Sequence, residues 1–198
     1  ASMRDQAERL RELVSSQNHK VNLPKARIIA VTSGKGGVGK TNLSVNLSIY
    51  LSKLGQKVTL IDTDLGLANI DLILGITPKY HLGHFFAGER DLSDVVLEGP
   101  AGIKVIAGGS GFQELADLSS WQMNNCISNF SALEEDNDFI IFDTGAGISS
   151  KVIKFLMAAE EIIVVTIPEP TSIADAYGVI KVISKENPTA KVYVAVNM

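Results

Sequence analysis

The stretch Ser33-Gly34-Lys35-Gly36-Gly37-Val38-Gly39-Lys40-Thr41 decides the fold of this chain. Residues 34–41 match the pattern G-x-x-x-x-G-K-[ST], which is typical of phosphate-binding loops. Glycines let the backbone N–H groups of such a loop turn inward around phosphate oxygens, and the N-terminus of the following helix favours the same anion. The sequence therefore predicts a nucleotide-binding loop; the alternative is a glycine-rich turn that matches by chance.

The residues on either side of the loop fit this prediction. The run Ile28-Ile29-Ala30-Val31 precedes the loop and predicts a strand. Leucines at helical spacing follow it: Leu43, Leu47, Leu51 and Leu54. Within the loop, Lys40 is predicted to neutralise charge on the β- and γ-phosphates, and the hydroxyl of Thr41 is predicted to bind Mg²⁺.

Beyond the loop, short β-branched runs alternate with longer stretches of helical periodicity. The predicted strands are residues 27–32, 57–62, 103–107, 138–143, 161–167 and 191–197. The predicted helices are residues 40–54, 119–134, 149–158 and 172–185. Strands that are apolar throughout are typical of a parallel sheet covered on both faces. The sequence thus predicts an α/β domain over residues 27–198, with a mostly parallel central sheet and helices on both faces.

The two ends of the chain carry further expectations. Ala7, Leu10 and Val14 fall at helical spacing, so residues 3–17 are predicted to form a short amphipathic helix. Residues 18–26 are polar, contain a proline and show no period, which indicates a linker. The last predicted strand ends next to the end of the chain, whereas domain boundaries fall in exposed linkers, so we expect a further C-terminal portion.

Three aspartates are candidates for completing a site around the loop. Asp62 and Asp64 follow Leu60-Ile61, and both are predicted to face the loop from the end of a parallel strand. One of them can support Mg²⁺ and the other can orient a water, although aspartates at such a turn also cap the next segment. Asp143 ends the apolar run Phe139-Ile140-Ile141-Phe142, which is typical of the strand whose carboxylate reaches the metal.

Other polar residues give weaker signals. Lys35 adds a second lysine to the loop, and it either supports the transferred phosphoryl group or is a solvated surface lysine. The histidines at 19, 81 and 84 lack the spacing of a metal site, and His81 and His84 are interpreted as loop residues. Core packing is the interpretation for the remaining candidates, Trp121, Cys126 and Phe130.

Composition excludes several classes of protein. The hydrophobic share of 45% and the charged share of 20% are those of a globular domain rather than a disordered one. The net charge of −4 gives no electrostatic case for nucleic-acid binding. The single cysteine excludes an internal disulfide and a four-cysteine iron–sulfur cluster shared by two chains. No apolar run approaches the roughly 20 residues of a membrane-spanning helix.

With these residues in hand, the chain resembles the MinD/ParA class of deviant-Walker ATPases. The resemblance rests on Lys35 in the phosphate loop, on residues 62–71 as a first switch and on residues 143–147 as a second. It implies a SIMIBI-type P-loop fold, slow Mg²⁺-dependent ATP hydrolysis and an ATP-dependent homodimer, in which Lys35 contacts the partner's nucleotide. The implied catalytic residues are Lys35, Lys40 and Asp64, and the implied metal residues are Thr41, Asp62 and Asp143. The implied nucleotide-binding residues are Gly34, Lys35, Gly36, Gly37, Val38, Gly39, Lys40, Thr41, Asn42 and Asn197, the last of these at adenine.

Within this class the chain is similar to the FlhG family, also called YlxH or FleN, which regulates flagellar number and placement. Residues 5–11 resemble the D-Q-A-x-x-L-R helix with which that family stimulates the GTPase FlhF, and the residues implied in this role are Asp5, Gln6, Ala7, Leu10 and Arg11. Components of the flagellar switch and C-ring are the other implied partners. A cytoplasmic protein is implied, with peripheral inner-membrane association of the full-length form when ATP is bound, through a C-terminal helix that this sequence lacks.

Two alternatives stay within the same class. One is a MinD-type regulator of division-site selection, but a MinD starts almost directly at its first strand, and the predicted helix at residues 3–17 argues against it. A ParA-type partitioning ATPase needs a basic DNA-binding surface, and the sequence shows no basic cluster.

Overall fold

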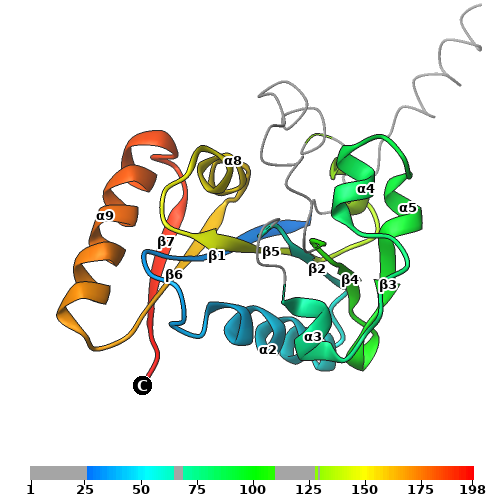
Figure 1. Ribbon diagram of the computed structural model, residues 1–198, viewed down its shortest axis with the longest axis horizontal. Coiled ribbons are helices and arrows are strands. Elements are labelled where there is room, and N and C mark those ends of the chain that lie inside the picture. Colours follow the sequence, from blue (N-terminus) through cyan, green and yellow to red (C-terminus); the bar gives the residue numbers. More distant parts are fainter. Residues whose placement is uncertain (1–25, 65–68, 110–127, 129) are drawn as a thin grey trace, which may run out of the picture.

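The computed structural model describes residues 26–64, 69–109, 128 and 130–198. Within these ranges, seven strands form one sheet in the order β3-β4-β2-β5-β1-β6-β7 (Figure 1). Their bounds are β1 Arg27–Ser33, β2 Val58–Asp62, β3 Val96–Glu98, β4 Lys104–Ile106, β5 Phe139–Ala146, β6 Glu161–Thr166 and β7 Lys191–Val196. All neighbouring strands run parallel except β3 and β4, so the prediction of a mostly parallel sheet is confirmed.

Helices lie on both faces of the sheet (Figure 1). Their bounds are α2 Lys40–Lys53, α3 Ile70–Leu74, α4 Leu82–Phe86, α5 Leu92–Val95, η1 Pro100–Gly102, α7 Ser131–Glu134, α8 Ser150–Ala158 and α9 Pro170–Glu186. Val45 of α2 and Ile70 of α3 belong to one buried cluster, whereas Phe155 of α8 and Val179 of α9 belong to the cluster on the other face. No helix of the described ranges combines the length and the hydropathy that crossing a membrane requires.

The central strands are buried along almost their whole length. Every residue of β2 is buried, and every residue of β1 after Arg27 is buried as well. Residues directly opposite each other in the β2–β5 pair include Ile61 with Phe142 and Asp62 with Asp143. The apolar runs at the centre of the sheet therefore become strands covered on both faces, whereas the edge strand β7, also predicted to be buried, is mostly exposed. The register of β2 on β5 brings two aspartates together at the carboxyl edge of the sheet.

Several small elements were not predicted. The strand β3 pairs antiparallel with β4 at the edge of the sheet, and the short helices α3, α4 and α5 lie between β2 and β3. Elements of three to five residues are too short to show a period of 2.0 or 3.6. The helix α9 begins at Pro170, two residues before the predicted start, because proline suits the first turn of a helix.

Other predictions need correction or fall outside the described residues. The interpretation of His84 as a loop residue is wrong, since it lies inside α4. Ala26, assigned to the linker, is 1% exposed and belongs to the core. Phe130 is 2% exposed, as predicted. The helix at residues 3–17, the linker up to residue 25, Trp121, Cys126 and most of the helix predicted at 119–134 lie outside the described residues.

Candidate functional site

The phosphate loop joins β1 to α2, as predicted, and glycines set its shape. Gly37 has a φ of 78° and Gly39 a φ of 90°, both in the left-handed region that glycine adopts without a steric penalty. Gly39 is the N-cap of α2, and as a glycine it has no side chain to cap the N–H groups of the first helical turn. These N–H groups and the positive end of the α2 dipole make the loop a site for an anion.

Two close contacts hold this loop in place. A side-chain carbon at Gly34 would lie 2.3 Å from the backbone carbonyl carbon of Asp175 in α9. A side-chain carbon at Gly39 would lie 2.4 Å from Nδ2 of Asn197, which follows β7 and donates a hydrogen bond to the carbonyl oxygen of Val38 at 3.0 Å. The loop is thus fixed between α9 and the end of β7, and its first and last glycines leave no room for a side chain. The role of Asn197 at adenine stays a prediction.

Lys40 points from α2 onto the central strand β5. Its Nζ lies 2.9 Å from Oδ1 of Asp143, and the two side chains are 10% and 2% exposed. The hydroxyl of Ser44, one helical turn further along α2, donates to the same oxygen at 2.9 Å. Thr41 is half-buried and Asn42 is exposed in the first turn of the same helix. The predicted phosphate lysine and the predicted metal carboxylate therefore lie in direct contact.

Asp62 lies beside Asp143 on the neighbouring strand, and its side chain is buried. Its carboxylate accepts hydrogen bonds from the backbone N–H groups of Asp64 at 3.0 Å, Asn69 at 3.0 Å and Ile70 at 3.3 Å. Burial, and after it the charge of Asp143, raise the pKa of Asp62 to about 7, although these three hydrogen bonds act in the opposite direction. Asp62 therefore caps the segment that follows β2, and it also forms part of a buried carboxylate pair.

This carboxylate pair fits a divalent cation. Lys40 pairs with Asp143, whereas no ion pair of Asp62 is found among the described residues, and burial followed by the charge of Asp143 raises the pKa of Asp62. Oxygen ligands from carboxylates and a hydroxyl are those that Mg²⁺ prefers. Asp62, Asp143 and the hydroxyl of Thr41 are the residues that would hold the ion together with nucleotide phosphates.

Asp64 belongs to the first predicted switch and lies beside the second. The strand β2 ends at Asp62, so Asp64 lies beyond it, and the alternation of side chains along a strand does not fix its direction. Asp64 is half-buried, and its carboxyl oxygen Oδ1 lies 3.5 Å from the place of a side-chain carbon at Gly145, near the end of β5. Gly147, just beyond, donates its N–H to the carbonyl oxygen of Ser33 at 2.8 Å. The first switch, the second switch and the phosphate loop are thus neighbours.

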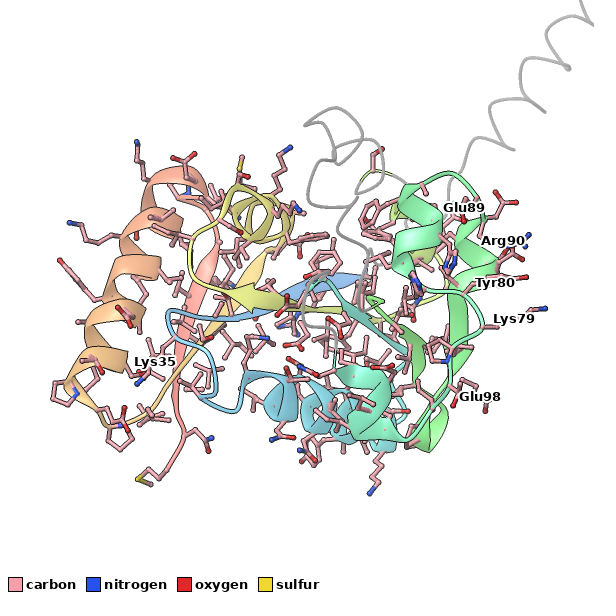
Figure 2. All side chains as sticks on the ribbon, viewed as in Figure 1. Lys35, Lys79, Tyr80, Glu89, Arg90 and Glu98 are labelled. Atoms are coloured by element: carbon pink, nitrogen blue, oxygen red, sulfur yellow. The ribbon has the colours of Figure 1, made fainter. Side chains whose placement is uncertain are left out.

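Lys35 lies apart from this buried cluster. Its Nζ forms an ion pair with Oε2 of Glu169 at 3.0 Å, and the two side chains are 43% and 54% exposed. Figure 2 shows Lys35 beside the start of α9, at the opposite end of the molecule from Tyr80 and Arg90. Glu169 is the N-cap residue of α9. The second lysine of the loop is therefore on the surface and has a partner from its own chain.

Sequence reasoning missed two residues of this region. Ser44 falls four residues after Lys40, and residues at this spacing share one face of a helix. The helical register of α2 was therefore a signal that could have found it. Glu169 is 134 residues from Lys35 in the sequence, and no local pattern connects the two.

His81 and His84 take a structural role. His81 is the N-cap of α4 and accepts a hydrogen bond from the N–H of Gly83, while Nδ1 of His84 accepts one from the N–H of His81. Across the described ranges, no cluster of three or more histidine, cysteine, aspartate or glutamate side chains has the geometry to hold a metal ion.

Comparisons with known proteins identify the class to which this fold and site belong. The family model described as an AAA domain matches residues 26–193. The chain belongs to this family, in its MinD/ParA branch of P-loop ATPases.

Individual relatives are more specific. The chain is 45% identical over 172 residues to the antiactivator FleN of Pseudomonas aeruginosa, covering 87% of this chain and 61% of that protein. It is 39% identical over 186 residues to the flagellum site-determining protein YlxH of Helicobacter pylori, covering 92% of this chain and 63% of that protein. The septum site-determining protein MinD of Pyrococcus horikoshii, solved with Mg-ADP, superposes with a TM-score of 0.75 at 30% identity, covering 84% of this chain and 68% of that one. The chain thus spans less than two thirds of the length of these FleN and YlxH relatives.

Proposed function

We propose that this chain is the nucleotide-dependent switch of a regulator of flagellar number and placement. In the proposed cycle it binds ATP with Mg²⁺, pairs with a second copy while ATP is bound, and separates after slow hydrolysis. The loop geometry, the buried Lys40–Asp143 contact and the similarity to FleN and YlxH support this proposal.

Each residue of the site has a role in this cycle. The N–H groups of the loop and Lys40 hold the phosphates, and the N-cap glycine lets the helix end approach them. Bound Mg²⁺ would supply charge neutralisation at the β- and γ-phosphates. Asp64, half-buried against Gly145, orients the attacking water. Asp62 and Asp143 place their carboxylates beside the loop, where they would supply oxygen ligands and negative charge to a bound Mg²⁺.

The observation that carries the proposal is the contrast in exposure between the two lysines of the loop. Lys40 is 10% exposed and faces its own sheet, whereas Lys35 is 43% exposed and faces outward. A lysine that points away from its own sheet is available to the phosphates of a nucleotide in a second copy. This is the arrangement expected of an ATP-dependent homodimer.

Light scattering of the chain with Mg²⁺ and a non-hydrolysable ATP analogue tests this proposal. We expect the wild type to shift from monomer to dimer, and Lys35→Ala to remain monomeric while still binding the analogue in calorimetry. Lys53→Ala is the matched control, because Lys53 is an exposed lysine in the last turn of α2. An unchanged dimer in Lys35→Ala would contradict the role of Lys35 across the interface.

We further propose that residues 3–17 act as a helix that binds and stimulates the GTPase FlhF. The support comes from the sequence: the segment is amphipathic, and residues 5–11 resemble the activator motif of the FlhG family. An isolated helix of this length has only marginal stability in water, so we expect binding to the partner to stabilise it. Association of the full-length protein with the inner membrane belongs to the same proposal.

The GTPase rate of FlhF, measured with the whole chain and with a peptide of residues 3–17, tests the activator role. Both are expected to raise the rate, and Gln6→Ala is expected to reduce the stimulation in each. Glu8→Ala is the control, since Glu8 lies between the motif positions. Without stimulation by either form of the wild-type sequence, a MinD-type role in division-site selection would become the leading hypothesis.

A further inference from the structure

The strongest unassigned feature of the molecule is the hydroxyl of Ser44. The side chain of Ser44 is fully buried, in the second turn of α2. Its Oγ lies 2.9 Å from Oδ1 of Asp143 and 3.1 Å from the carbonyl oxygen of Lys40. A serine hydroxyl has one proton, so these two acceptors share it.

A hydroxyl in the interior of a helix often bonds to the carbonyl four residues back, and this alone carries no function. Ser48 shows this simple case, because its Oγ donates to the carbonyl oxygen of Ser44 at 2.7 Å. Ser44 differs from Ser48 by its bond to a carboxylate on another element. Hydrogen bonds to ionised acceptors are the stronger ones, so the pull on the shared proton is towards Asp143.

The consequence for Asp143 is a fixed orientation. Lys40 and Ser44 both donate to Oδ1, and they come from adjacent turns of the same face of α2. Two donors on one oxygen prevent the carboxylate from rotating, and they leave Oδ2 as the oxygen for a cation. Lys40 must also serve the phosphates, so Ser44 is the donor that can remain on Asp143 after a nucleotide binds.

We propose that Ser44 is a positioning residue that sets the carboxylate of Asp143 for the magnesium shell of a bound nucleotide. This inference rests on the proposed binding of ATP with Mg²⁺. Ser44 contacts neither the nucleotide nor the metal in this role, and its effect passes through Asp143. Outer-shell partners of this kind typically contribute 10- to 100-fold in metal affinity.

The test is a titration of Mg²⁺ against nucleotide affinity, measured by calorimetry with ATP for the wild type, Ser44→Ala, Ser44→Thr and Ser48→Ala. We expect Ser44→Ala to raise the half-saturating Mg²⁺ concentration about 10-fold. Its affinity for ATP in EDTA should stay within about 2-fold of the wild type, because the loop and Lys40 are intact. Ser44→Thr keeps the hydroxyl and should restore the wild-type Mg²⁺ dependence.

Ser48→Ala is the matched control, since it removes a buried hydroxyl one turn away on the same helix. Equal Mg²⁺ dependence in Ser44→Ala and Ser48→Ala would show that Ser44 only stabilises the helix, and would overturn the proposal. A second arm uses Asp143→Asn. If Ser44 acts through Asp143, adding Ser44→Ala to Asp143→Asn changes the Mg²⁺ dependence no further, whereas an additive effect would contradict that route.

Failure of this inference and failure of the proposed function give different results. If the wild type binds ATP with a clear Mg²⁺ dependence that Ser44→Ala leaves unchanged, the positioning role alone is wrong. If the wild type binds no ATP at any Mg²⁺ concentration, the proposed function fails and the role of Ser44 fails with it. Urea unfolding of each variant identifies any variant that does not fold. If Ser44→Ala does not fold, the role of Ser44 is decided by comparing the Mg²⁺ dependence of Ser44→Thr in the wild-type and the Asp143→Asn backgrounds.

Discussion

The two lysines of the phosphate loop are five residues apart in sequence, and the fold gives them opposite surroundings. Lys40 is 10% exposed and pairs with a carboxylate in the centre of the sheet. Lys35 is 43% exposed and pairs with Glu169, which is 54% exposed. The first pair is built into the core and cannot separate without a replacement charge, whereas the second can exchange partners at small cost. One loop therefore combines a fixed phosphate lysine with a movable one.

The largest expected effect tests the buried side of this comparison. Lys40→Ala should lower the affinity for ATP by about 100-fold or more, because it removes the charge-assisted bonds to the phosphates. It also leaves Asp62 and Asp143 buried without a cation, so the unfolding free energy of the nucleotide-free protein should fall by about 3 kcal/mol. Calorimetry with ATP and urea unfolding measure the two effects.

Lys35→Ala is the control for Lys40→Ala, because the same substitution at the exposed lysine should cost at most about 1 kcal/mol of unfolding free energy. Equal losses in the two variants would break the distinction between a fixed and a movable lysine.

Asp64 is half-buried, which makes it less exposed than Lys35, and it lies beside Gly145. Asp64→Ala should slow ATP hydrolysis about 100-fold, the size expected when a group that orients the water is lost. ATP affinity should stay near the wild-type value, because the contacts of Lys40 and the loop are unchanged. Single-turnover hydrolysis at saturating ATP separates the two quantities. A normal rate in Asp64→Ala would assign the water to another residue.

The raised pKa of Asp62 predicts how the buried cluster responds to pH. Its pKa is about 7 in the folded protein, against an ordinary value of 3.8, so between these two values the folded state holds a proton that the unfolded chain has lost. The unfolding free energy of the nucleotide-free protein should therefore fall as the pH rises through this window, by a few kcal/mol at most. Asp62→Asn removes the titrating group, so its stability should fall less between pH 4 and pH 7.

Urea unfolding of both proteins over the pH series, without Mg²⁺ or nucleotide, measures this difference. Asp136→Asn is a suitable control, because Asp136 is an exposed aspartate. Parallel pH profiles for the wild type and Asp62→Asn would show that the folded protein does not hold the extra proton.

The sequence predicted the buried region well and the exposed one poorly, for a physical reason. The loop, its flanking strand and helix, and Asp143 are local patterns, because glycine conformation, helical spacing and apolar strands are all encoded within a few neighbours. The Asp62–Asp143 pairing follows from the same patterns once β2 lies beside β5. The raised pKa of Asp62 does not follow from these local patterns, because desolvation depends on everything that packs around the carboxylate.

The partner of Lys35 could not be predicted. Glu169 reaches it only because β6 neighbours β1 in the sheet and α9 begins just after β6. No periodicity connects residues that distant. For the same reason the antiparallel strand β3 was missed, since its pairing with β4 is decided by the sheet edge and not by its three residues.

The smallest expected effect concerns Glu169. If Lys35 must leave Glu169 to reach the nucleotide of a second copy, the ion pair in the free chain opposes dimerisation. An exposed pair contributes about 0.2–1 kcal/mol, which corresponds to about 1.4- to 5-fold for each protomer. Glu169→Gln should therefore strengthen the ATP-dependent dimer by a small factor, and the gain should shrink as salt screens the pair in the wild type.

Analytical ultracentrifugation with an ATP analogue at several salt concentrations resolves a change of this size. Glu160→Gln is the control, because Glu160 is an exposed glutamate just before β6 that forms no ion pair with Lys35. In a Lys35→Ala background, Glu169→Gln should have no effect on the dimer, since the ion pair is already absent. A weaker dimer in Glu169→Gln would reverse the argument: Glu169 would then support Lys35 within the dimer, and the second lysine would be held in position rather than released.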